Sequence, residues 1–175
     1  MALVVVKVDS TVFKCGFIDK TGKEVIPLKY DRAYSFKDGL ALVNIGAKYD
    51  HSEEDLVGGK WGYIDKTGKE IIPLKYDSAG DFFSGLARVK LNGKWGYIDT
   101  TGKEVVPLKY DEVFAFSEGL ARAKLKNKWG YIDQTGQVII PFKYNDAKGF
   151  KDGLAEVKLG NKSLYINKQG EVVKK

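Results

Sequence analysis

The chain has 175 residues, 43% of them hydrophobic and 30% charged, a composition typical of a folded domain that excludes an intrinsically disordered chain. No stretch approaches the roughly 18 consecutive apolar residues of a membrane-spanning helix, so we expect no membrane insertion. The net charge of +6 is spread along a chain in which lysine alternates with acidic residues, and this pattern argues against nucleic-acid binding.

The chain opens on an apolar stretch that we predict to be the first strand of a repeated unit. Ala2-Leu3-Val4 matches Ala41-Leu42-Val43, so the chain begins at the same phase as a later unit. The stretch lacks the basic leader and the longer apolar region of a secretory signal peptide. No secretion signal is therefore expected in these residues, and the sequence assigns no compartment.

A unit of 34 residues is repeated along most of the chain. The recurring hexapeptide is Lys60-Trp61-Gly62-Tyr63-Ile64-Asp65, and its copies begin at Lys94 and Lys128. A fixed period predicts a repeat architecture, in which one unit buries its apolar face only against its neighbours. We predict a single β-repeat domain over residues 1–175, with units at about 2–40, 41–86, 87–120, 121–154 and 155–175.

One insertion breaks this period. Cys15, the sole cysteine, stands where the other units have tryptophan, and it precedes Trp61 by 46 residues rather than 34. The extra residues lie near 47–59 and are polar and acidic, which predicts a projecting loop that either contacts a partner or is a tolerated surface insertion. The candidate partner-binding residues are Tyr49, Asp50, His51, Glu53, Glu54 and Asp55.

The first half of a unit is predicted to be a β-hairpin. Over residues 87–91, apolar residues alternate with Arg88 and Lys90, the period-two pattern of a strand with one buried face. Asn92-Gly93 follows, a strong signal for a two-residue hairpin turn because both residues tolerate positive φ. The return strand is predicted over residues 94–99.

A second turn and a third strand complete the unit. Asp99 begins a turn in which its carboxylate accepts local backbone hydrogen bonds, and Gly102 takes the left-handed position. The third strand covers residues 103–106, and Pro107, which has no N–H to donate, ends the strand or lies at a sheet edge. Each unit is therefore predicted to be a three-stranded antiparallel meander.

The link between units is predicted to be an extended segment followed by a tight turn. Residues 110–116 favour an extended segment, with a short helical turn capped by Asp111 as the alternative. A glycine then marks the turn into the next meander, at Gly39, Gly85, Gly119 and Gly153.

The aromatic residues of the hexapeptide have two interpretations. Strand alternation puts Trp61 and Tyr63 on one face and Ile64 on the other, so both faces are expected to be at least partly buried. In the structural interpretation, tryptophan, tyrosine and proline stack between units, and Gly62 leaves room for a neighbouring ring. In the alternative, an aromatic ladder binds glycans or choline through Trp61, Tyr63, Trp95, Tyr97, Trp129 and Tyr131.

Enzyme chemistry has little support in the residues. His51 is the only histidine, whereas acid–base or nucleophilic catalysis normally needs a positioned imidazole. The repeated Asp65, Asp99 and Asp133 supply one acid per unit, while Ca²⁺ requires six to eight oxygen ligands. With one cysteine, neither a disulfide within the chain nor a thiolate cluster can form. We expect no catalytic residues, no metal site and no cofactor.

The phased motifs resemble a known family. Lys-Trp-Gly-Tyr-Ile-Asp-x-x-Gly, then Ile-Pro-Leu-Lys-Tyr-Asp, then Gly-Leu-Ala-x-Val is similar to the bacterial WG repeat, also called the KWG repeat, over residues 14–159. The chain departs from it at Cys15-Gly16-Phe17, at Ser163-Leu164-Tyr165 and in the insertion. The resemblance implies β-rich repeats and supplies no catalytic residues.

These observations predict an all-β fold and a binding role. We expect tandem 34-residue meanders in an open, solenoid-like array, with a closed, propeller-like ring as the alternative. The expected function is a non-enzymatic interaction module that presents an extended surface to a protein or peptide partner. The alternative function is a cell-surface module that binds glycans or choline.

Overall fold

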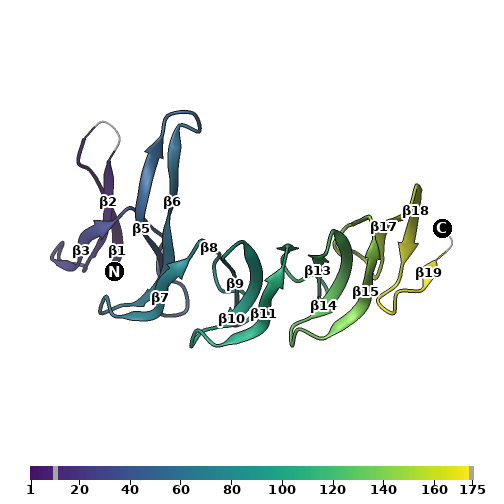
Figure 1. Ribbon diagram of the computed structural model, residues 1–175. Helices are drawn as coiled ribbons and strands as arrows, with labels where there is room; N and C mark the ends of the chain where they lie inside the picture. Colours follow the sequence, from purple (N-terminus) through teal and green to yellow (C-terminus); the bar gives the residue numbers. More distant parts are fainter. Residues whose placement is uncertain (10–11, 174–175) are drawn as a thin grey trace. The chain divides into compact units, whose positions relative to one another are not determined.

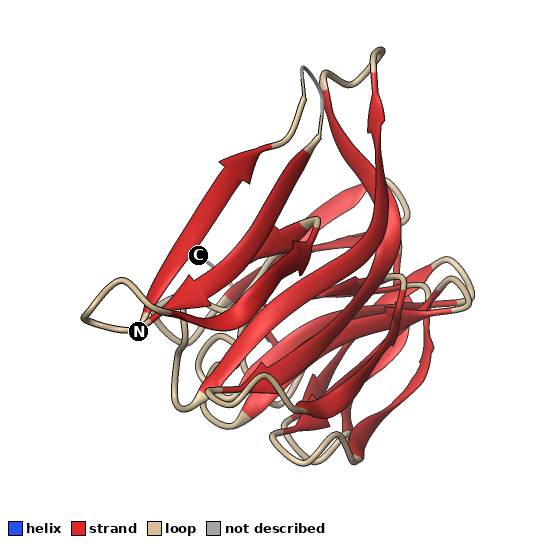
Figure 2. Cartoon of the chain, turned by 90° about the vertical axis from the view of Figure 1, so that its left-hand side faces the viewer, coloured by secondary structure: helices blue, strands red, loops and turns tan. Residues whose placement is uncertain are grey.

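The computed structural model describes residues 1–9 and 12–173. Within this range the chain forms nineteen β-strands and no helix, so no described segment forms a helix that could span a membrane (Figure 1; Figure 2). The prediction of an all-β fold is confirmed. Two compact units are present: residues 1–91 with 100–102 form the first, and the rest of the described chain forms the second.

The strands form five antiparallel sheets. The first sheet contains β1 (Ala2–Lys7), β2 (Phe13–Ile18) and β3 (Glu24–Tyr30). The second contains β4 (Arg32–Ala33), β5 (Leu40–Asp50), β6 (Asp55–Asp65) and β7 (Glu70–Tyr76). The third contains β8 (Ser78–Ala79), β9 (Leu86–Leu91), β10 (Lys94–Asp99) and β11 (Glu104–Tyr110).

The two remaining sheets repeat the same order. The fourth contains β12 (Glu112–Val113), β13 (Leu120–Leu125), β14 (Lys128–Asp133) and β15 (Val138–Tyr144). The fifth contains β16 (Asp146–Ala147), β17 (Ala155–Leu159), β18 (Lys162–Ile166) and β19 (Val172–Val173). Each sheet consists of consecutive strands and none closes into a barrel, which is consistent with the predicted open array of tandem repeats.

The structure confirms the meander and adds a short fourth strand to it. The link after Tyr110 is extended, and β12 pairs with β13 of the next meander. Glu118 and Gly119 then form the tight turn with φ values of 51° and 88°, closed by paired bonds between Ser117 and Leu120. The extended interpretation of the link is therefore correct, and the helical alternative is wrong.

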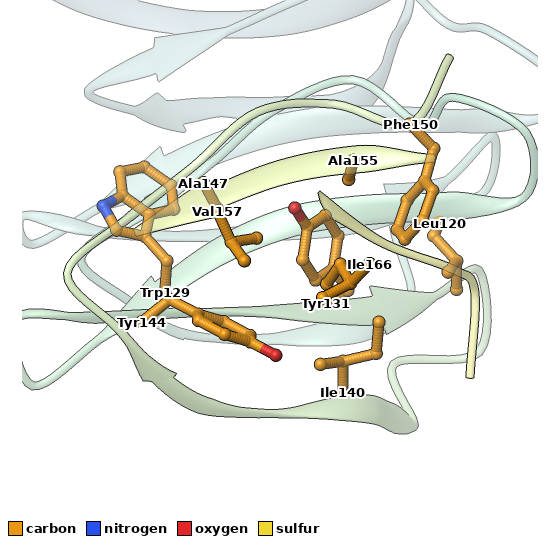
Figure 3. Close-up of a cluster of buried hydrophobic side chains, with 10 residues drawn as sticks. All are labelled: Leu120, Trp129, Tyr131, Ile140, Tyr144, Ala147, Phe150, Ala155, Val157 and Ile166. Carbon is orange, nitrogen blue, oxygen red and sulfur yellow. The ribbon is translucent and has the colours of Figure 1, made fainter. Parts of the chain in front are cut away.

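The apolar core lies between consecutive sheets. In the first compact unit, Phe17 and Ile26 of the first sheet pack with Val43 and Ile64 of the second. In the second unit, Tyr131 and Ile140 pack with residues of the fifth sheet such as Val157 (Figure 3). Within each compact unit, neighbouring repeats therefore bury apolar side chains against each other, as the period predicts.

The glycine of the hexapeptide is required by a close backbone approach. Trp61 pairs with Tyr76 and Tyr63 pairs with Ile72, so two steps along β6 correspond to four along β7, which bulges. A Cβ atom on Gly62 would lie 2.6 Å from the Ile72 carbonyl oxygen and 2.7 Å from the Leu74 nitrogen. The expectation that Gly62 makes room for a ring is wrong, because it makes room for backbone.

The prolines occupy the same bulge. Pro73 lies inside β7, the edge strand of its sheet, and is exposed. An edge position within a bulge accepts a residue without an N–H group, so the strand continues through the proline. The expectation that proline marks an edge is confirmed, whereas the expectations that it stacks between units or ends the strand are wrong.

The turn after the hexapeptide has the predicted chemistry. Asp65 Oδ1 accepts hydrogen bonds from the Thr67 N–H at 2.8 Å, the Thr67 hydroxyl at 2.6 Å and the Lys69 N–H at 3.1 Å. The bonds from Thr67 lower the pKa of Asp65 below its ordinary value. The turn glycines have φ values of 83° to 86°, at Gly22, Gly68, Gly102 and Gly136.

Alanine substitutions at Gly22 and Gly102 distinguish the cost of backbone strain from the cost of crowding between repeats. Alanine in the left-handed region costs roughly 1 to 2 kcal/mol, so Gly22→Ala should lower the free energy of unfolding by about that amount. A Cβ on Gly22 would meet nothing within 4 Å, but one on Gly102 would lie 3.2 Å from Ile72 Cγ1 of the preceding repeat. We therefore expect a larger loss for Gly102→Ala in urea unfolding. Equal losses would show that Ile72 yields freely, and a neutral result would contradict the turn.

Candidate functional site

The tyrosines of the hexapeptide are structural. Tyr63 and Tyr131 are 1% and 0% exposed. The Tyr63 hydroxyl donates to the Gly80 carbonyl at 2.5 Å, and the Tyr131 hydroxyl donates to the Lys148 carbonyl at 2.7 Å. Tyr97, also buried, donates to a carbonyl 17 residues further on in the same way. Each tyrosine therefore fixes the link that follows its own repeat, and little of its ring is left to contact a ligand.

The tryptophans are more accessible than the tyrosines, and Trp61 and Trp129 each lie beside an aromatic ring of the preceding link, Tyr34 and Phe114 respectively. Trp61 and Trp95 are half-buried, whereas Trp129 is buried. The Trp129 ring lies 5.8 Å from the Phe114 ring, and the Arg122 guanidinium lies 3.8 Å from the Phe114 ring centre. Of the six residues proposed as a ladder, only Trp61 and Trp95 present appreciable surface.

An ion pair links the hexapeptide lysine to the aspartate 17 residues later. Lys60 pairs with Asp77, and Lys94 with Asp111, each at 2.6 Å between Nζ and Oδ1. The Lys94 ammonium group lowers the pKa of Asp111. Lys14 and Asp31 form the same pair in the first repeat. The recurrence of both residues at constant spacing was the signal available in the sequence.

Asp31 also holds the hairpin of the following repeat. Its second carboxylate oxygen accepts hydrogen bonds from the Gly46 N–H at 2.6 Å and the Ala47 N–H at 3.1 Å. The Asp31 side chain is only 10% exposed, so the bonds are largely shielded from water. This carboxylate therefore couples the first repeat to the base of the insertion in the second.

The insertion is a β-hairpin extension, and its prediction as a loop is wrong. Pairing between β5 and β6 continues from Ala47 and Gly58 to Asp50 and Asp55, and only residues 51–54 form the turn (Figure 1). The inserted residues on either side of the turn are able to continue the ladder of the existing hairpin, and a ladder satisfies backbone groups that an irregular loop leaves to solvent.

The candidate partner-binding residues gather at the end of this hairpin. Asp50 accepts hydrogen bonds from the Ser52 N–H and hydroxyl, and Asp55 pairs with Arg32; these contacts lower the pKa of both carboxyl groups. Glu53 and Glu54 are exposed at the turn. Two further candidates lie together: the ring of Tyr49 meets that of His51 edge-on at 5.1 Å. The result is an acidic tip on a basic chain.

A second long hairpin lies in the first repeat, so the interpretation of a single insertion is incomplete. Ala2 precedes Cys15 by thirteen residues, whereas Ala87 precedes Trp95 by eight. This difference was the signal in the sequence. The hairpin joins β1 to β2 and is closed at one point by a bond from the Val8 N–H to the Val12 carbonyl at 2.8 Å.

A groove of about 340 Å³ lies between the two long hairpins. Its walls come from the start of β2 and from the extension of β5 and β6, and Asp31 also lines it. The lining residues are Val12, Phe13, Lys14, Asp31, Ala47, Lys48, Tyr49, His51 and Leu56. Among the described residues, no group of three or more histidine, cysteine or acidic side chains is placed to hold a metal ion.

Because of the buried tyrosines, the free energy of unfolding is expected to fall with rising pH in the alkaline range. Burial raises the pKa of Tyr63, Tyr131 and Tyr110 above the ordinary value of about 10. Their contribution is therefore complete below about pH 10 and is lost as the pH rises further, because unfolded phenols ionise while the folded ones stay neutral. We expect the urea midpoint to fall above that pH, and Tyr131→Phe to reduce the slope. A midpoint independent of pH would contradict this assignment.

Solved structures similar to this chain share little sequence with it. The extracellular domain of a proposed one component system from B. thetaiotaomicron is 15% identical, with a TM-score of 0.40, covering 97% of this chain and 30% of that one. A protein of unknown function from Bacteroides caccae is 16% identical, with a TM-score of 0.33, covering 94% of this chain and 74% of that one. The chain thus spans under a third of the first structure. No curated protein matches the sequence.

The repeats themselves match a described family. Its profile, the WG containing repeat, covers residues 16–49, 61–95, 95–129 and 129–162. These four matches extend over most of the chain and follow the meanders, bulges and turns described above. The chain therefore belongs to the family of proteins built from the WG containing repeat.

Proposed function

We propose that this chain is a non-enzymatic interaction module that presents an extended surface to a protein or peptide partner. The observation that carries the proposal is the elongated hairpin of residues 46–59, whose tip holds four carboxylates on a chain of net charge +6. Stacking of the repeats does not require this extension, since other repeats turn in two residues, as at Asn92-Gly93.

The roles of the repeated residues support a binding module over an enzyme. The hexapeptide lysine forms an ion pair, its glycine admits a strand, its tyrosine bonds to a carbonyl and its aspartate closes a turn. These contacts account for the repeated polar side chains by structure alone. Burial of the tyrosines likewise favours a protein or peptide partner over a glycan or choline ligand.

Shortening the hairpin tests the proposal. Replacing residues 46–59 with Asn-Gly reproduces the turn of the third sheet, and Asp31 can then bond to the new turn as Asp111 bonds to the Asn127 N–H. We expect the shortened chain to unfold near the same temperature and to lose proteins that the intact chain captures from its host.

The decisive measurement uses a purified partner. A protein lost on shortening is produced separately, and its affinity for both forms is measured by calorimetry. An unchanged set of captured proteins, together with equal affinities, would show that the hairpin does not bind a partner and would remove the main support for the proposal.

A further inference from the structure

Two strand edges in the groove have no described strand beside them. β3 pairs with β2 from Cys15 to Ile18 and leaves the edge of β2 at Phe13 uncovered. β4 pairs with β5 only at Val43 and Asn44, so no described strand covers the outer edge of residues 47–50. Phe13 and residues 47–49 all line the same groove, so both edges border one space.

Backbone polar groups are available on these edges. The bond from the Val8 N–H to the Val12 carbonyl makes these residues a hydrogen-bonded pair between β1 and β2. Because antiparallel pairing alternates, the next residue, Phe13, directs its backbone N–H and C=O away from β1 and toward the groove. On the open edge of residues 47–50, the Ala47 N–H points outward and already donates to Asp31 Oδ2. Because outward-facing residues alternate along a strand, the Ala47 carbonyl and both backbone groups of Tyr49 are also directed outward. Such edges are templates for an added strand.

The side chains favour a particular kind of strand. Phe13 is 37% exposed, and with Tyr49 and Leu56 it gives the groove apolar contact surface. The hairpin tip beside the groove carries Asp50, Glu53, Glu54 and Asp55, whereas Lys14 in the lining is already paired with Asp31. The lining itself includes Lys48, and Asp55 of the tip is paired with Arg32, so the acidic charge beside the groove comes from Asp50, Glu53 and Glu54. A positively charged segment complements these three carboxylates at the tip.

We propose that the groove between the two long hairpins binds an extended segment of a partner protein by strand addition. The segment carries apolar or β-branched side chains between lysine or arginine residues, so that its backbone bonds to the edges of β2 and β5 while its cations meet the acidic tip. This inference rests on the proposed interaction function and assigns its site and the chemistry of its partner.

Selection from a random-peptide display library on the whole chain tests the assignment. We expect enriched peptides to be basic, rich in β-branched residues and free of proline, and a proline placed at the centre of such a peptide should abolish binding. Shortening residues 46–59 to Asn-Gly should weaken the selected peptide by about tenfold or more.

A matched pair of double variants tests the charge. Glu53→Gln with Glu54→Gln should weaken the selected peptide by about threefold or more at low salt, and the difference should shrink as salt rises. Glu24→Gln with Glu70→Gln removes the same charge from exposed positions outside the groove and should leave affinity unchanged. Thermal unfolding of each variant shows whether its fold is intact.

Several results would overturn the inference. Peptides that bind the intact and shortened chains equally would exclude the groove while leaving the interaction function intact, as would the enrichment of proline-rich or acidic peptides. The absence of any enriched peptide would also overturn it, and the proposed function would then be decided by capture of host proteins. Self-association lost on shortening, measured by sedimentation, would make a second copy of the chain the occupant.

Discussion

Gly62→Ala is expected to lower the free energy of unfolding by about 3 kcal/mol, an overpacking cost at the upper end of the usual range. The added Cβ would lie 2.6 Å from the Ile72 carbonyl oxygen and 2.8 Å from Leu74 Cα. Both atoms belong to the backbone of the bulged edge strand, so no side chain can rotate away to relieve the contact. The bulge must shift, and its displacement would disturb Ile72, which is fully buried.

Urea unfolding followed by tryptophan fluorescence measures this effect, with Gly149→Ala as the control. A Cβ atom on Gly149 would meet nothing within 4 Å, and the residue has no left-handed φ, so alanine there should be neutral or slightly stabilising. A loss below about 1 kcal/mol for Gly62→Ala, well short of the overpacking range, would show that the bulge is compliant and that the close approach does not explain the glycine.

Tyr131→Ala is expected to cost about 3 to 5 kcal/mol, the range for truncating a fully buried aromatic side chain. Tyr131 is 0% exposed, and its ring centre lies 4.8 Å from that of Phe150 in the core between the fourth and fifth sheets (Figure 3). Truncation leaves a cavity at a contact between two repeats, so the fifth sheet should also separate from the fourth more readily.

Tyr131→Phe separates the hydroxyl from the ring. It removes only the 2.7 Å bond to the Lys148 carbonyl and should cost about 1 kcal/mol. Hydrogen exchange of residues 155–166 reports on the fifth sheet, and we expect faster exchange for Tyr131→Ala than for Tyr131→Phe. Equal destabilisation by the two substitutions would assign the role of Tyr131 to its hydroxyl and not to packing.

The proposed partner site differs in kind from the repeated surface. The repeated aromatic and ionic residues are engaged in holding one repeat to the next, as Tyr63 and Lys60 show. The two long hairpins depart from the repeat and carry the groove, with an acidic tip on one of them. Specific binding is therefore expected where the chain departs from its repeat, because those residues are not committed to stacking.

The sequence by itself determined the repeat, the meander and the turns. Asn92-Gly93, with φ values of 50° and 76°, and Asp65 with its bonds to Thr67 and Lys69 depend only on residues that are neighbours in the chain. Their conformations follow from local sterics and local hydrogen bonds, which a short stretch of sequence specifies. The family assignment rests on the same local patterns.

Only the tertiary structure decided the contacts between repeats and the groove. These features bring together segments that are separated in the chain by turns or whole strands. They are the bulge beside Gly62, the hydrogen bond from the Gly46 N–H to Asp31, and the groove that is bordered by Phe13 and residues 47–49. The inserted residues are polar, and their composition is typical of a loop, yet pairing along the existing β5–β6 ladder made them strands. That pairing depends on the register of the whole hairpin, and the groove depends on two hairpins standing next to each other, so neither is encoded in a local stretch of sequence.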